Sequence, residues 1–337
     1  MDQMQVEDLS FMKGMFYLVV QNRRLQYKFW IRRNITIIKG QSATGKTTLI
    51  EMIQEYNDNG ASSGVSIQSD VDCVVLSGRF WKEELSVIRH SIVFLDEGNR
   101  FVTSEDFAQA IRGTDNYYVI VTRERLENIP YSVEEIYGIR NSGKYGALKK
   151  SYHEFYRLYE EEDFNKPIKC GCVLTEDSQS GFQFFRDICQ KKDWECYTAA
   201  GKSNIFANAL KHLDKDLLIV ADGAAFGPEM SRMVGLSKRF HNVHLFLPES
   251  FEWMILYAGV IPMPMNEEIF EHTSDCIDSA RYFSWEQFFT AYLIALSHGT
   301  VWQYTKNRIN PVYLQENVEK KILRLLPIVF IDGEEDA

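Results

Sequence analysis

The stretch ITIIKGQSATGKTTLIEMI, residues 35–53, decides the fold of the first part of the chain. Its first four residues are apolar and β-prone, which predicts a buried strand. Gly40 and Gly45 bound a short polar turn, and apolar residues then recur at helical spacing. The stretch therefore predicts a strand, a loop and a helix in direct succession.

The turn in this stretch, residues 40–47, matches G-x-x-x-x-G-K-[ST] without a mismatch. In such a loop, backbone N–H groups converge on phosphate oxygens, and the following helix presents its positive end to the same anion. We expect Lys46 to reach the β- and γ-phosphates and Thr47 to place its hydroxyl on Mg²⁺. The alternative is a chance match on a glycine turn. The predicted phosphate-binding residues are Gly40, Gln41, Ser42, Ala43, Thr44, Gly45, Lys46, Thr47 and Thr48.

A second apolar run, residues 92–95, ends in Asp96 and Glu97. Together with the loop, this pair predicts that Asp96 holds the metal and that Glu97 polarises the attacking water, with Lys46 and Glu97 as the catalytic residues. Alone, such an acidic strand end would more often be a solvated turn. The next predicted strand, residues 117–121, ends in polar residues suited to sense the γ-phosphate. Arg123 and Arg125 are candidate arginine fingers across a subunit interface, and the alternative is that they are ordinary exposed arginines of a loop.

Strands alternate with helices in residues 1–127, after a hairpin of two β-rich runs at 15–21 and 25–31. With the loop and the Asp-Glu strand end, this order resembles the additional-strand, catalytic-glutamate division of P-loop NTPases, with an AAA- or ABC-like ATP-binding domain. The hairpin is similar to that of ATPase cores related to ABC and SMC proteins, including the overcoming-lysogenization-defect (OLD) family. No LSGGQ-like signature precedes Asp96.

A second α/β series follows, with acids at the ends of its first and third strands. The acids and an intervening Gly-Lys-Ser-Asn turn are similar to the Toprim domain that follows the ATPase in OLD-type nucleases. This resemblance implies Glu176 as general acid/base, Asp222 as a Mg²⁺ ligand and Lys202 near a phosphate. Ala224 stands where that family has a second Asp, so the alternatives are a degenerate metal site or ordinary polar residues at the sheet edge.

The predicted fold class is α/β: a P-loop NTPase parallel sheet and a second Toprim-like, Rossmann-like α/β domain with C-terminal helices. We place the ATPase domain at 1–127, a loop-rich connector at 128–165, the second domain at 166–250 and a mostly helical segment at 251–337. Aromatic residues of the helical segment recur at helical spacing without interleaved basic residues, which indicates core packing rather than a platform for bases.

The 337 residues are 45% hydrophobic and carry a net charge of −10, which excludes a disordered chain and makes a globally basic nucleic-acid binder improbable. No apolar stretch is long enough to span a membrane, and the six scattered cysteines suit reduced thiols, so we expect a cytoplasmic protein.

These features predict an ATP-binding protein that hydrolyses ATP with Mg²⁺ and whose nucleotide cycle gates the second domain. Alternatives are an ATP-dependent DNA nuclease of OLD type, a non-hydrolytic nucleotide switch and, third, a small-molecule kinase. The choice between ATP and GTP stays open, as do DNA, a partner protein and a second copy of the chain as partners.

Overall fold

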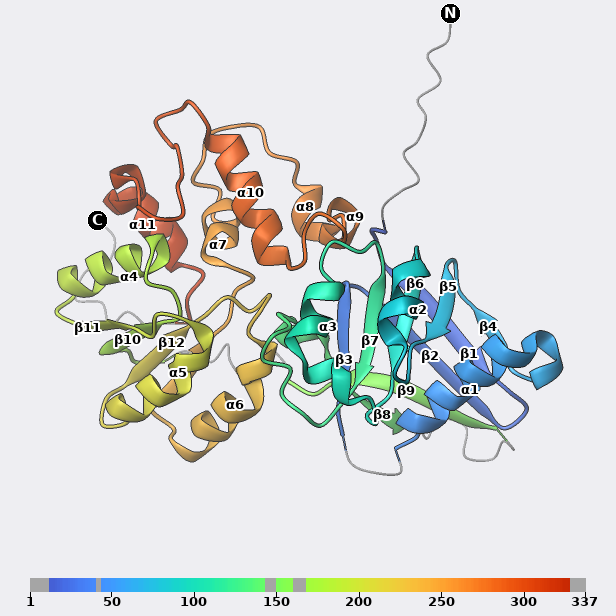
Figure 1. The fold of residues 1–337 in the computed structure, drawn as a ribbon. Coiled ribbons are helices and arrows are strands. Elements are labelled where there is room, and N and C mark those ends of the chain that lie inside the picture. Colours follow the sequence, from blue (N-terminus) through green and yellow to red (C-terminus); the bar gives the residue numbers. More distant parts are fainter. Residues whose placement is uncertain (1–11, 41–43, 143–149, 160–167, 328–337) are drawn as a thin grey trace, which may run out of the picture. The chain divides into compact units, whose positions relative to one another are not determined.

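The computed structural model describes residues 12–40, 44–142, 150–159 and 168–327. The chain forms two compact units (Figure 1). Unit 1 comprises residues 1–131, 135–158 and 266–283, and unit 2 comprises residues 132–134, 159–265 and 284–337. Each unit is built on one sheet, which confirms a mixed α/β fold.

The sheet of unit 1 has nine strands among the described residues, in the order β4-β1-β2-β9-β8-β3-β7-β6-β5. The strands are β1 (Phe16–Gln21), β2 (Leu25–Ile31), β3 (Ile35–Ile38), β4 (Ser66–Gln68), β5 (Asp72–Val75), β6 (Ser91–Leu95), β7 (Tyr117–Val121), β8 (Ile136–Asn141) and β9 (Ser151–Arg157).

Strands β8, β3, β7, β6 and β5 run parallel to one another. The predicted hairpin is confirmed, because β1 and β2 pair antiparallel. We expected residues 128–165 to form a loop-rich connector. Instead, β8 and β9 from this segment pair with β3 and β2 and join the two halves of the sheet. Glycines at 138, 143 and 146 favoured a loop, but hydrogen bonds to neighbouring strands outweigh the weak strand propensity of glycine.

The helices of unit 1 are α1 (Lys46–Asn59), α2 (Trp81–Val87), α3 (Glu105–Ala110), α8 (Glu268–Glu271) and α9 (Thr273–Cys276). Helix α1 directs Leu49, Met52 and Ile53 into the same apolar core as the inner faces of β1, β2 and β6. This burial fixes the first turn of α1 beside the end of β3. The segment 266–283, which we placed in a C-terminal helical segment, belongs to unit 1: the N–H of Gly14 donates to the carbonyl of Ser274, 2.9 Å away.

Unit 2 contains a four-stranded parallel sheet in the order β11-β10-β12-β13. Its strands are β10 (Cys172–Thr175), β11 (Glu195–Thr198), β12 (Leu217–Val220) and β13 (Val243–Phe246). Its helices are α4 (Ser180–Lys191), α5 (Lys202–Ala209), α6 (Met230–Arg239), α7 (Phe251–Tyr257), α10 (Trp285–Ser297) and α11 (Glu316–Leu323).

The direction in which successive strands are added to this second sheet reverses after β11. From β10 it passes to β11 on one side and then returns across β10 to β12 on the other. Right-handed crossovers therefore place α4 on one face and α5 and α6 on the other, as Figure 1 shows. The reversal lies between β10 and β12, and the crevice at such a point, outside the carboxyl ends of the strands, is where open α/β sheets usually bind ligands.

Across the described residues, no helix is both long and apolar enough to cross a bilayer.

Glycine 223 packs too closely against the loop after β13 to carry a side chain. A Cβ there would lie 2.4 Å from the carbonyl oxygen of Leu247. We expect Gly223→Ala to lower the free energy of unfolding by about 2 kcal/mol, because backbone must shift to relieve the clash. Urea unfolding measures the change. Gly235→Ala, in helix α6 with open space around its Cβ position, is the matched control and should stabilise. Equal losses in both variants would contradict the packing argument.

Candidate functional site

The phosphate-loop candidate lies where three parallel strands of unit 1 end. In the register, Ile38 of β3 pairs with Val121 of β7, and Leu95 of β6 pairs with Ile120. Residues after β3, β6 and β7 therefore meet at one edge of the sheet. The structure brings the predicted Asp96 and Glu97 to the same edge as the predicted loop, with β7 between the two parent strands.

The glycines of the loop adopt conformations that other residues avoid. Gly40 has φ +135° and Gly45 has φ +89°. Gly45 is also confined, because a Cβ on it would lie 2.7 Å from the hydroxyl of Tyr27. The predicted residues Gln41, Ser42 and Ala43 lie outside the described residues.

Lys46 begins helix α1, and its side chain folds back over the loop. Its Nζ donates to the carbonyl oxygen of Gly40 and to Oγ1 of Thr44, both at 3.0 Å. Only 6% of Lys46 is exposed. Burial lowers its pKa, the negative charges of Glu97 and Asp96 oppose this shift, and Arg123 adds to it. The four charges therefore lie close enough to interact. Thr47 is exposed and Thr48 is half-buried in the same turn.

The acidic pair after β6 is ordered by short local bonds. The N–H of Glu97 donates to Oδ1 of Asp96 at 2.8 Å, and Nδ2 of Asn99 donates to the Asp96 carbonyl at 3.0 Å. The carboxylate of Glu97 also forms an ion pair with Arg123, whose Nε lies 2.8 Å from Oε1. Both side chains are substantially exposed, at 54% for Arg123 and 37% for Glu97.

This pairing differs in kind from the role that the sequence suggested for Arg123. We expected an arginine finger reaching across a subunit interface, and the structure shows an arginine engaged with Glu97 of its own chain. Arg125, the next arginine of this loop, lies 3.2 Å from Glu127 through Nη2.

Two residues at the loop were missed from the sequence. The hydroxyl of Tyr27, in β2, donates to the carbonyl of Gly45 at 2.9 Å, and its ring stacks on His153 of β9 with centroids 4.7 Å apart. The alternation of buried and exposed residues in β2 could have placed Tyr27 inside, but only the pairing of β2 with β9 brings His153 beside it. The parallel pair of β2 and β9 thus supports the loop directly.

The side chains at this edge would supply only some of the oxygen ligands that Mg²⁺ requires. Mg²⁺ is commonly held by one or two protein oxygens together with phosphate oxygens and water. The hydroxyl of Thr47 and the carboxylate of Asp96 are such donors. Within the ranges that the structure describes, no cluster of three or more His, Cys, Asp or Glu side chains could hold a metal ion alone. A metal here would therefore depend on the phosphates.

The acids predicted in unit 2 also meet, at the switch point between β10 and β12. Oε2 of Glu176 accepts the backbone N–H of Asp222 at 3.2 Å. Lys202 begins α5 and donates to the carbonyl of Ala225 at 3.4 Å. Ala224, at the position of the expected second Asp, is 3% exposed. Glu176 and Asp222 line a cavity of only about 20 Å³.

Burial perturbs both carboxyl groups in the same direction. It raises the pKa of Glu176 to about 7, with the charge of Glu286 as the next cause. Burial, followed by the charges of Glu286, Glu176 and Glu252, raises the pKa of Asp222 well above its ordinary value. The sequence did not reveal Glu252 and Glu286, because they come from helices α7 and α10, 76 and 110 positions after Glu176.

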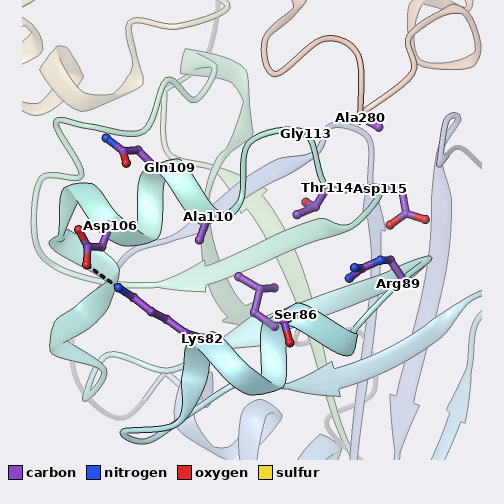
Figure 2. Close-up of a pocket in the computed structure, with 11 residues that line it drawn as sticks. Lys82, Ser86, Arg89, Asp106, Gln109, Ala110, Gly113, Thr114, Asp115 and Ala280 are labelled. Atoms are coloured by element: carbon purple, nitrogen blue, oxygen red, sulfur yellow. Dashed lines mark hydrogen bonds and ion pairs between the residues drawn. The ribbon is translucent and has the colours of Figure 1, made fainter.

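A larger hollow of about 870 Å³ lies elsewhere in unit 1, along α2, α3 and the turn at 113–115. Figure 2 shows Lys82 and Asp106 together at one side of it, where their side chains form an ion pair of 2.5 Å. None of the residues predicted to bind phosphate or metal lines this hollow. It is therefore a feature distinct from the strand edge.

Comparison with known proteins adds no family to these observations, since no family model and no curated protein matches the chain.

The bond from Tyr27 to Gly45 gives a test of the loop's support. Tyr27→Phe keeps the ring stacked on His153 and removes only the hydroxyl, so we expect a loss of about 1 kcal/mol in the free energy of unfolding. Chemical denaturation followed by tryptophan fluorescence measures it. Tyr17→Phe, on the neighbouring strand, is the control and should change little. If Tyr27→Phe unfolds like the wild type, the hydroxyl does not support the loop.

The raised pKa of Glu176 predicts a pH dependence of stability. A carboxyl group whose pKa is raised by folding stays protonated in the folded protein at pH values where it is already ionised in the unfolded chain. The folded state therefore becomes less favourable as the pH rises between the two pKa values. Stability should therefore fall as pH rises from about 4.5, the ordinary value, to about 7, by up to about 3 kcal/mol. Glu176→Gln should reduce this fall without abolishing it, because the pKa of the buried Asp222 is raised as well, and Asp214→Asn, at an exposed position of the same unit, should leave it unchanged. Thermal unfolding from pH 4.5 to 8 measures it; parallel curves for all three proteins would refute the assignment.

Proposed function

We propose that the chain binds ATP with Mg²⁺ at the edge formed by β3, β6 and β7 and hydrolyses it. The observation that carries this proposal is the meeting of Lys46, Asp96 and Glu97 at one strand edge, from motifs about 50 residues apart in the sequence. The strand order supports it as well. Strand β7 lies between β3 and β6, as the additional strand does in the division of P-loop NTPases that the sequence resembles.

The loop and the first turn of α1 would hold the phosphates. The backbone N–H groups at the start of α1 have no partners within the helix, and the helix dipole makes this end positive. Lys46 already lies over the loop, held by Gly40 and Thr44, so little of its side-chain freedom remains to be lost on binding. The glycine conformations at 40 and 45 leave the backbone free of side chains where it would approach the ligand.

Hydrolysis requires a water molecule, a base and stabilisation of the developing charge. The water oxygen attacks the γ-phosphorus as the bond to the β–γ bridging oxygen breaks, which yields ADP and phosphate. Glu97 would accept the proton of that water. Thr47 and Asp96 would hold Mg²⁺, which neutralises charge on the phosphate oxygens. Lys46 stabilises the same charge from the side of the loop.

Arg123 adds a positive charge to this scheme. Its guanidinium lies against the carboxylate of Glu97 and within electrostatic range of Lys46. A γ-phosphate, with its higher charge, would compete with Glu97 for Arg123. We propose that this exchange frees Glu97 to act as a base only when the nucleotide is present.

The decisive experiment is Mg²⁺-dependent ATP hydrolysis by the full chain. Glu97→Gln should keep ATP binding and lower kcat by about 100-fold or more, because it removes the base but not the phosphate contacts. Lys46→Ala should weaken binding itself. Glu83→Gln, on the exposed face of α2, is the matched control and should behave like the wild type. Binding without turnover in the wild-type chain would remove the catalytic role of Glu97 and leave a nucleotide switch.

The same assay with GTP tests the choice of nucleotide, and with DNA it tests a coupling to nucleic acid. We also propose that the protein is cytoplasmic. We propose that the nucleotide cycle gates unit 2. DNA cleavage lost on Glu176→Ala would favour an ATP-dependent nuclease of OLD type. A change of assembly state with ATP, without cleavage, would favour a nucleotide-controlled interaction with a partner protein or a second copy of the chain.

A further inference from the structure

A loop after α10 reaches over the switch point of unit 2 and places two side chains among its acids. The backbone carbonyl of Lys306 accepts the N–H of Ser180 at 3.0 Å, which ties the loop to the first turn of α4. The hydroxyl of Tyr304 lies 2.5 Å from Oγ of Ser180 and donates to Oε1 of Glu252 at 2.8 Å. Tyr304 and Glu252 are 1% and 2% exposed. This contact is therefore a built part of the unit's interior.

Lys306 brings a positive charge to the same place. Its Nζ lies 2.5 Å from Oε1 of Glu286, in the first turn of α10. The charges of Glu252 and Asp222 also act on it and, with Glu286, raise its pKa despite burial, so it is an ammonium ion at neutral pH. The acids that surround the switch point are Glu176, Asp177, Asp222, Glu252 and Glu286.

These residues do not fit the metal site that the Toprim resemblance implies. Ala224 supplies no carboxylate, and an ammonium ion stands among the acids that a metal would need. Two hard cations, or even one, would require several carboxylates free to coordinate and neutralise the charge. At the switch point of unit 2, the side chain of Lys306 supplies positive charge to the acids.

We infer that Lys306 is the built-in counter-cation of the carboxylate cluster at the switch point of unit 2, so that the chain itself, and not a divalent cation, balances the charge of that cluster. The ion pair with Glu286 and the anchoring of the loop through Tyr304 and Ser180 hold the ammonium in place. The inference does not depend on nucleotide hydrolysis in unit 1.

The test counts Mn²⁺ bound to the full chain, without nucleotide, by electron paramagnetic resonance. Asp222→Asn identifies any ion held by the cluster, since it leaves Asp96 and Thr47 in unit 1 unchanged. In the wild-type chain we expect no Mn²⁺ that is lost on Asp222→Asn at up to about 1 mM metal. Lys306→Met should bind Mn²⁺ at least about tenfold more tightly than the wild type, and Lys306→Met with Asp222→Asn should lose that gain. Lys306→Arg keeps the charge and should exclude Mn²⁺ as the wild type does.

Stability gives a second readout. Lys306→Met should lower the melting temperature of the metal-free chain by about 3 °C or more, and adding Glu286→Gln to it should restore part of the loss, because fewer charges are then left unbalanced. The inference is overturned if wild-type Mn²⁺ binding depends on Asp222, if Lys306→Met gains no such ion, or if the effects of Lys306→Met and Glu286→Gln simply add. Should Lys306→Met fail to fold, Lys306→Met with Glu286→Gln, which leaves fewer charges unbalanced, replaces it in the Mn²⁺ count.

Discussion

The parallel pairing of β3, β7 and β6 is the constraint on which the candidate site of unit 1 depends. Each strand is fully buried, and each ends at the same edge of the sheet. A shift of one residue in either pairing would move every side chain to the opposite face and disrupt the close packing on both faces, so the packing specifies the register. Because the register is held, Asp96 and Glu97 are brought to the edge where the loop of Lys46 begins.

Both units place charge at the carboxyl ends of parallel strands, but they balance it differently. At the edge of unit 1, Glu97 and Arg123 form a partly exposed ion pair, and the buried Lys46 donates to backbone and hydroxyl oxygens. At the switch point of unit 2, Glu176, Asp177 and Asp222 line a small cavity, and a lysine from a distant loop pairs with Glu286. The ion pair at the first edge is reached by solvent, whereas the acids at the second lie in a largely closed crevice.

The phosphate loop is supported by strands β2 and β9, which lie outside the loop motif. Tyr27 and His153 belong to strands that precede and follow the loop by 18 and 108 positions relative to Gly45. They meet because β9 enters the sheet beside β2. Strand β9, in the segment we expected to be a connector, therefore supplies the ring that stacks on Tyr27 beside Gly45. The glycines of this segment favoured a loop, although Tyr152, Phe155 and Tyr156 of β9 are of a type enriched in strands.

Local patterns in the sequence determined the strand-loop-helix at 35–53, the hairpin before it, the alternating elements of both units and the acids at the strand ends. Periodicity and glycine placement act over a few residues, so they can be recognised without knowing the fold. Only the tertiary structure decided that β8 and β9 join the first sheet, that Arg123 faces Glu97, and that Glu286 and Lys306 stand beside Asp222. These contacts join residues far apart in the chain, and they form because burial and strand pairing bring distant segments together, which no local pattern encodes.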